Sequence, residues 1–120
     1  MSGVALKKAV QRLRTSVEEL DRQRLVQFNE LLGCTLTTEI TPRRQVRIGG
    51  EVRSVRVVPR AGAPALEVTI NDGSGTATAV FLGRSKIAGI APGRHIAVEG
   101  VAGRSGNRYL IFNPLYTLFP

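Results

Sequence analysis

Basic and aromatic side chains are the residues of this chain whose types and spacing could do chemistry. A single nucleic-acid strand is held by a basic groove that follows its phosphates and by flat side chains on which its bases stack. Arg60 is expected in the loop after the first strand, and Arg104 and Arg108 flank a turn before the last strand. If these two loops border one face, the three arginines converge there although they lie far apart in the sequence.

Further basic residues could extend this track. Arg47 and Arg53 have the same parity on the first predicted strand, although a bulge at residues 49–50 would shift one relative to the other. Arg56 precedes the loop, and Arg84 and Lys86 follow the third strand. Each of them taken alone is more often a solvated surface residue, because charge by itself is a weak indicator of binding. Only their grouping favours a nucleic-acid site.

Flat side chains are few. Phe81, Tyr109 and Tyr116 are the candidates for stacking, and Tyr109 is the best because it follows Arg108 near the last loop. Phe81 alternates with two alanines, so packing inside the barrel is the alternative for its ring. Each stacked base contributes about 1 to 3 kcal/mol. Binding is therefore expected to be weak, salt-dependent and tolerant of sequence.

Residues suited to catalysis or metal binding are scarce. His95 and Cys34 are the only histidine and the only cysteine, too few for a metal site or an internal disulfide. Asp72 is better explained by a turn than by acid or base catalysis, and the sequence around Gly73 lacks the Gly-Lys-Ser/Thr ending of a phosphate-binding loop. We expect no enzymatic activity, no cofactor and no metal.

The charge of the chain is unevenly distributed. Among 120 residues, 17 are Lys or Arg and 9 are Asp or Glu, a net charge of +8. Residues 35–120 carry +6 of this and residues 1–34 carry +2. A basic β region attracts polyanions such as nucleic acid, although a merely basic, soluble surface is the simpler alternative.

The compartment is predicted to be the cytoplasm. Lys7 and Lys8 are not followed by the apolar segment of a secretory signal, and no apolar run approaches the length of a spanning helix. A single cysteine also favours a reducing environment.

The first part of the chain, residues 1–34, is predicted to be a helical extension. Apolar residues recur there at helical spacing: Leu6, Val10, Leu13, Val17 and Leu20. A capping box from Ser16 to Glu19 favours two short helices with a break near Thr15 over one helix of about 28 residues. Leu25, Phe28 and Leu32 form a second apolar set that ends at Gly33. The first stripe is expected to cover an end of the β region, with self-association or a membrane surface as alternatives.

The rest of the chain is predicted to be all β, organised around a hairpin at residues 65–83. Leu66, Val68 and Ile70 alternate with polar residues before an Asp72–Gly75 turn. Strands are expected at residues 45–58, 66–71, 76–82, 94–101 and 108–119, with a bulge at 49–50, a helical turn within 84–92 and an interruption at 114.

This order of elements resembles the OB-fold, a five-stranded Greek-key barrel. The strings VRIGGEV, ALEVTINDGSGTATAVFLG and PGRHIAVEGVAGRSGNRYLI are similar to the OB domains of RecG-type helicases and of the anticodon-binding part of class II tRNA synthetases. The whole chain most resembles small actinobacterial OB-fold proteins. The resemblance implies a barrel at residues 43–119 after the helical extension. Neither the helicase nor the synthetase activity is implied, because their catalytic domains are absent.

Together these features predict a non-enzymatic protein that binds single-stranded DNA or RNA, with DNA favoured and with little sequence specificity. The alternative is an adaptor whose barrel or N-terminal helices bind another protein, which the few aromatic residues and the apolar stripe favour.

Overall fold

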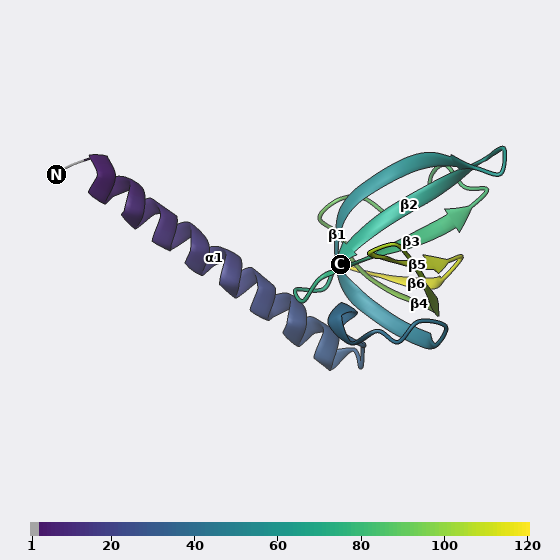
Figure 1. The fold of residues 1–120 in the computed structure, drawn as a ribbon, viewed down its shortest axis with the longest axis horizontal. Helices are drawn as coiled ribbons and strands as arrows, with labels where there is room; N and C mark the ends of the chain where they lie inside the picture. Colours follow the sequence, from purple (N-terminus) through teal and green to yellow (C-terminus); the bar gives the residue numbers. More distant parts are fainter. Residues whose placement is uncertain (1–2) are drawn as a thin grey trace.

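The computed structural model describes residues 3–120, except for the side chains of residues 3–6, 13 and 14. Over these residues the chain forms one long helix, a short 3-10 helix and one sheet of six strands. The elements are α1 (Gly3–Leu31), η1 (Thr37–Glu39), β1 (Gln45–Arg60), β2 (Ala63–Asn71), β3 (Thr76–Leu82), β4 (His95–Ser105), β5 (Arg108–Phe112) and β6 (Leu115–Phe119) (Figure 1). The mainly β fold with an N-terminal helix is confirmed.

The sheet closes into a barrel because β1 is long enough to serve two neighbours. The strand order is β1-β2-β3-β5-β4-β6, and β1 also pairs with β4. Residues 51–60 of β1 pair with β2, while residues 45–51 pair with β4. The register shifts between Val52 and Ser54, so the bulge lies there and not at Gly49 and Gly50 as predicted. A bulge bends a strand, which lets β1 pass from one side of the barrel to the other.

The two adjacent glycines have a different role, which is close approach. A Cβ on Gly50 would lie 2.1 Å from the backbone oxygen of Asn71, and one on Gly49 would lie 2.8 Å from Oδ1 of Asn29. Any side chain at Gly50 would collide with backbone. The pair therefore lets β1 approach β2 and α1 closely.

The end of the chain and the β3–β4 connection depart from the prediction in detail. The expected last strand is split at Asn113, whose φ of 48° turns the chain before Pro114. Its second part, β6, pairs with β4. Residues 84–92 form turns in place of the predicted helical turn, yet they still contribute Ile87 and Ile90 to the core.

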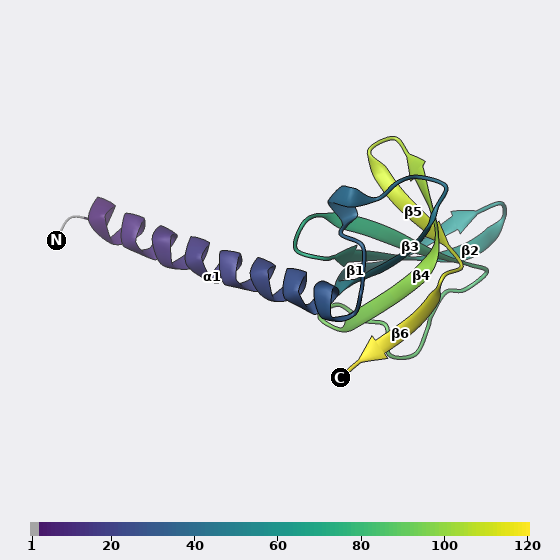
Figure 2. The ribbon, with the colours of Figure 1, turned by 90° about the horizontal axis from the view of Figure 1, so that it is seen from below.

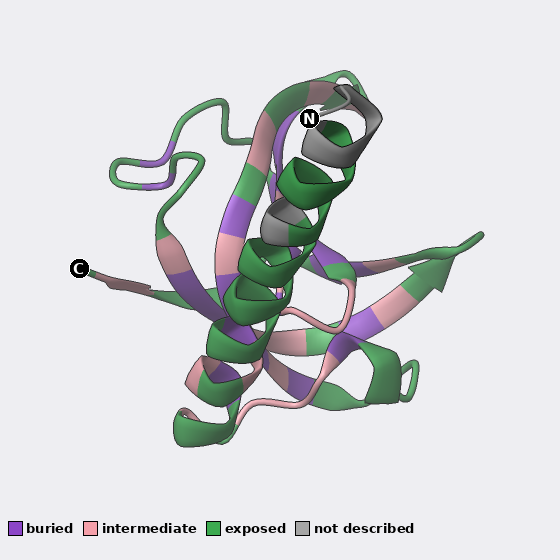
Figure 3. Ribbon diagram, turned by 90° about the vertical axis from the view of Figure 1, so that its left-hand side faces the viewer, coloured by how far each residue is buried: buried purple, intermediate pink, exposed green. Residues whose placement is uncertain are grey.

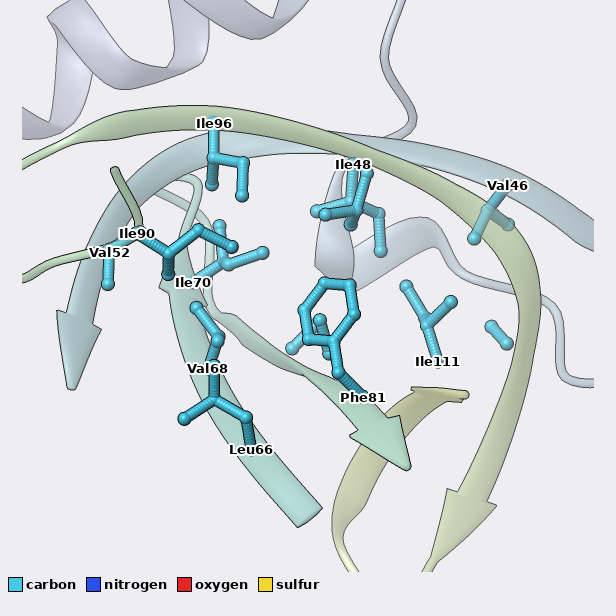
Figure 4. Packing of buried hydrophobic residues seen from close by; sticks show 14 of the residues in the cluster. Val46, Ile48, Val52, Leu66, Val68, Ile70, Phe81, Ile90, Ile96 and Ile111 are labelled. Carbon is cyan, nitrogen blue, oxygen red and sulfur yellow. The ribbon is translucent and has the colours of Figure 1, made fainter. Parts of the chain in front are cut away.

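Alternate residues of the strands fill the barrel, as their period predicted. Figure 4 shows them converging from facing strands. The largest contributors are Val46, Ile48, Val52, Leu66, Val68, Ile70, Phe81, Ile96, Val98 and Ile111. Phe81 is 6% exposed, so its ring belongs to the core. Stacking on a base, one of the two roles considered for Phe81, is wrong for this structure because Ala77 and Ala79 leave room inside the barrel that its ring fills.

α1 is continuous, so the predicted break near Thr15 is wrong. The hydroxyls of Thr15 and Ser16 donate to the carbonyl oxygens of Gln11 and Arg12, at 2.9 and 3.0 Å. They are therefore bonded within a helix and do not cap a new one. The stop at Gly33 is confirmed: its φ is +67°, and the amide of Cys34 donates to the carbonyl of Asn29 at 2.8 Å, the pattern of a Schellman motif.

Among the α1 residues whose side chains are described, those of the last turns pack on the barrel. Leu25 and Asn29 are buried, and the ring of Phe28 lies 5.3 Å from those of His95 and Phe119. The rest of the helix projects away from the barrel (Figures 1 and 2), and the residues before Leu25 whose side chains are described are exposed (Figure 3). The expectation that the first apolar stripe covers the barrel is therefore wrong for Val10, Val17 and Leu20. The other two members, at 6 and 13, lie outside the described side chains.

Within residues 3–120, no helix has both the length and the apolarity needed to span a membrane.

Candidate nucleic-acid interface

A buried carboxylate gathers arginines from two parts of the barrel. Glu67 of β2 faces Arg56 across the β1–β2 pair, and its side chain is 4% exposed. Arg56, Arg60 and Arg108 each donate through Nη2 to its carboxylate, at 3.2, 3.3 and 3.0 Å. We call these three residues the arginine cluster. With Glu67 it carries a net charge of +2.

Glu67 remains ionised because of these contacts. Burial alone would raise the pKa of its carboxyl group, but hydrogen bonds from Arg108, Arg56 and Arg60 outweigh burial and lower the pKa below the ordinary 4.5. The ionised carboxylate in turn restricts three long side chains that would otherwise be mobile. The cluster is thus organised before any ligand arrives.

This arrangement predicts a pH dependence of stability. Because the folded-state pKa of Glu67 is lowered, its contribution is full above the unfolded-state pKa and is lost as pH falls through the folded-state pKa. We expect Glu67→Gln to lower the free energy of unfolding by about 1 to 2 kcal/mol at about pH 7. Urea denaturation should show this difference shrinking toward about pH 3.

A matched control is Glu19→Gln, which removes a carboxylate from an exposed helical ion pair with Arg22. Glu19→Gln should leave the free energy of unfolding nearly unchanged across the same pH range. A Glu67→Gln difference that did not change with pH would contradict the assignment.

A cleft of about 430 Å³ lies beside the cluster. Its lining is polar and comes from β1, β2, β3 and the hairpin between β4 and β5: Ser54, Arg56, Thr69, Thr76, Thr78, Asn107, Arg108 and Tyr109. Arg56 and Arg108 belong both to the cluster and to this lining. Hydroxyl, amide and guanidinium groups are donors that suit phosphate and sugar oxygens.

Two aromatic rings at this face have arginines over them. The guanidinium of Arg104 lies 5.7 Å from the ring centroid of Tyr109, and that of Arg60 lies 5.4 Å from that of Phe112. Tyr109 is half-buried against the core, whereas Phe112 is 45% exposed. Phe112 was not among the predicted site residues, because the run Tyr-Leu-Ile-Phe gives no sign of which residues face outward.

The structure brings together only some of the predicted residues. Arg56, Arg60, Arg104, Arg108 and Tyr109 lie at or beside the cleft, whereas the remaining candidates are elsewhere: Arg47 pairs with Glu99 at 3.2 Å, Arg53 pairs with Glu51 at 3.7 Å, Arg84 and Lys86 are exposed beyond β3, and Phe81 is in the core. A bulge was expected to shift Arg47 relative to Arg53, and β1 does contain one, between Val52 and Ser54.

Across residues whose side chains are described, no group of three or more His, Cys, Asp or Glu is placed to hold a metal ion. The chemistry of this face is therefore that of guanidinium, hydroxyl and aromatic groups.

Comparison with known proteins identifies the fold. No curated protein matches the chain. Among solved structures, the OBody AM1L10 bound to hen egg-white lysozyme matches with a TM-score of 0.56 and 18% identity, over 72% of this chain and 90% of that one. The OBody AM3L09 bound to the same lysozyme matches with a TM-score of 0.54 and 18% identity, over 71% of this chain and 92% of that one. A replication protein A heterotrimer bound to ssDNA matches with a TM-score of 0.50 and 14% identity, over 78% of this chain and 77% of that one.

At such identities these likenesses show the fold alone, and the predicted similarity to RecG-type helicases and tRNA synthetases in particular stays a prediction. Residues 46–118 match the family model described as an OB-fold nucleic acid binding domain. Since this match covers more than half of the chain, the protein belongs to the family of OB-fold nucleic acid binding domains.

Proposed function

We propose that this chain is a non-enzymatic protein that binds single-stranded nucleic acid, DNA in preference to RNA, with little sequence specificity. The observation that carries the proposal is the arginine cluster beside a hydroxyl-lined cleft on the outer face of β1, β2 and β3. A similar solved structure, that of replication protein A, is bound to ssDNA, which supports the choice of ligand. The cytoplasm remains the expected compartment.

In this proposal, contacts to the phosphates of the bound nucleic acid provide most of the affinity. Arg56 and Arg108 contact phosphates from the cleft, and Glu67 holds their guanidinium groups in place, so less side-chain entropy is lost on binding. The exposed ring of Phe112 and the half-buried ring of Tyr109 accept one or two bases. Stacking tolerates any base, and the cleft's hydroxyl groups suit sugar and phosphate oxygens. The affinity is therefore sensitive to salt and only weakly sensitive to sequence.

Fluorescence anisotropy with labelled single-stranded DNA, duplex DNA and single-stranded RNA of equal length tests the proposal. Three to five phosphate contacts on a single strand predict a log-log salt slope of roughly −2 to −3.5. We expect the tightest binding to single-stranded DNA with a slope in this range. Equal affinity for all three ligands would contradict the proposal, because a generic basic surface does not distinguish them.

The double variant Arg56→Ala/Arg108→Ala tests the face. It leaves Arg60 paired with Glu67, so the carboxylate keeps a partner. Loss of two phosphate contacts should weaken binding about 15-fold at about 0.15 M salt and reduce the slope by about 1.4. The control, Arg22→Ala/Arg24→Ala, removes the same charge from exposed positions of α1. If both variants weakened binding equally, the loss would reflect net charge and not this face.

A protein-binding adaptor is a second candidate, because two similar structures are OBodies bound to lysozyme. Affinity purification with and without nuclease separates the two functions. Partners that depend on nucleic acid support the first, and partners that survive nuclease support the second.

A further inference from the structure

The exposed part of α1 has the features of a helix that needs a partner. Val10, Val17 and Leu20 are 47%, 50% and 52% exposed, although they lie on one stripe of the helix. Among the described side chains of α1, the first buried one is that of Leu25. Residues 3–24 of α1 form a helical segment in which no described side chain packs an apolar face on the barrel, and burial of such a face supplies most helical stability in proteins. The stripe should therefore be covered in solution.

The spacing of the stripe is that of a two-stranded coiled coil. Val10 and Val17 are seven residues apart, as are Leu13 and Leu20 in the sequence, which places the valines at heptad position a and the leucines at d. β-branched residues at a with leucine at d favour two-stranded association. The stripe thus fits a second helix of the same kind.

The charges on α1 indicate how the two helices are oriented. Residues 3–15 contain four basic residues and no acidic one, whereas residues 16–31 contain four acidic and two basic residues. Lys7 and Asp21 both occupy heptad position e, which faces the same position of the other helix in an antiparallel pair. A parallel pair would place the two basic halves together. An antiparallel pair places each basic half against an acidic half.

We infer that α1 is the self-association surface of this protein and that a second copy of the chain covers the stripe in antiparallel orientation. In this pair Val10 of each copy packs against Leu20 of the other. The two barrels lie at opposite ends of the paired helices, so each dimer carries two copies of the cleft.

Sedimentation equilibrium of the full chain over a range of concentrations tests the association. The average mass should rise toward twice the chain mass of 13.0 kDa. The variant Val10→Glu/Val17→Glu should remain monomeric throughout that range. Its changes lie at exposed positions, and the circular dichroism of its barrel provides the check on folding. A wild-type protein that is monomeric at every concentration overturns the inference.

The matched control is Gln11→Glu/Thr15→Glu, which adds the same charge at heptad positions b and f, away from the stripe. It should associate like the wild type. Equal loss of association in both variants would mean that charge, and not the apolar stripe, controls the mass, and would overturn the inference.

Cysteine cross-linking tests the orientation. In a Cys34→Ser background, a mixture of Val10→Cys and Leu20→Cys chains should form a mixed disulfide under mild oxidation, while Val10→Cys alone should not cross-link to itself. Efficient cross-linking of Val10→Cys to itself would indicate a parallel pair and overturn the antiparallel arrangement.

The same helix could instead serve as an arm for nucleic acid, which the variant Lys7→Gln/Lys8→Gln/Arg12→Gln distinguishes. The self-association model predicts that this variant associates more weakly, because it loses three of the four basic residues in residues 3–15. If its mass were unchanged while oligonucleotide binding by single chains weakened, α1 would be a nucleic-acid arm and the inference would be wrong.

Discussion

Replacing Asp72 with alanine is expected to lower the free energy of unfolding by about 3 to 5 kcal/mol. Asp72 is fully buried. Its carboxylate accepts hydrogen bonds from the amide of Thr37 at 2.6 Å and from the hydroxyl of Thr37 at 3.0 Å. It also accepts hydrogen bonds from the amides of Ser74 and Gly75, both at 2.9 Å. Alanine would leave these donors without their partner, and an unpaired buried donor loses its full hydration. Urea denaturation followed by circular dichroism measures the change.

The change should reach beyond the turn itself, because Asp72 joins three parts of the molecule. Its side chain connects the β2–β3 turn to η1, and its carbonyl oxygen accepts Nδ2 of Asn29 at the end of α1, at 3.0 Å. Hydrogen exchange in Asp72→Ala should therefore also increase around η1 and the last turns of α1. The control Asp21→Ala, at an exposed position of α1, should change stability by less than about 0.5 kcal/mol. A loss below about 1 kcal/mol in Asp72→Ala would contradict this role.

Asp72 also illustrates what the sequence could predict. Its turn was predicted from four consecutive residues, because turn chemistry is local. Its bonds to Thr37, 35 positions away, could not be predicted, since no local pattern encodes which distant amide a carboxylate will accept. The strand interiors were predictable for the same reason as the turn. Period-two alternation identifies a buried face without any knowledge of the partner strands.

The candidate site was predictable only in part. Alternation placed Glu67 on the outer face of its strand, but that face is normally solvated. Its burial depends on Arg56 and Arg60 of β1 and on Arg108 of the β4–β5 hairpin, which barrel closure brings together. The loops that border the face followed from the resemblance to OB-folds. The position of the bulge in β1 could not be predicted, because no glycine marks it.

α1 shows the same limit for a helix. The spacing of its apolar residues predicted an amphipathic helix correctly, but periodicity does not indicate what covers the apolar face. The second apolar set, which includes Leu25 and Phe28, packs on the barrel, whereas Val10, Val17 and Leu20 of the first set are exposed. The helix does not break near Thr15, because the hydroxyls of Thr15 and Ser16 bond to carbonyl oxygens of the preceding turn and do not cap a new helix.

The largest loss of nucleic-acid binding is expected from removing the whole arginine cluster together with its carboxylate. In the variant Arg56→Ala/Arg60→Ala/Arg108→Ala/Glu67→Gln no buried charge is left without a partner, so the barrel is not forced to unfold. If each arginine contacts one phosphate, the affinity for single-stranded DNA should fall about 50-fold at about 0.15 M salt. The log-log salt slope should become less steep by about 2. Anisotropy titrations at several salt concentrations measure both quantities.

The control for this variant carries the same change in net charge away from the cleft: Arg22→Ala, Arg24→Ala, Arg94→Ala and Glu19→Gln, all at exposed positions. Long-range attraction alone would weaken binding equally in both variants, because it depends on total charge. If the arginines contact phosphates at the cleft, the cluster variant should lose about 50-fold in affinity and the control should lose much less. Since Glu67 fixes the three guanidinium groups, Glu67→Gln alone separates charge from organisation. This variant should bind DNA more tightly if the local net charge determines the affinity. It should bind DNA more weakly if the fixed arrangement of the three arginine side chains determines the affinity.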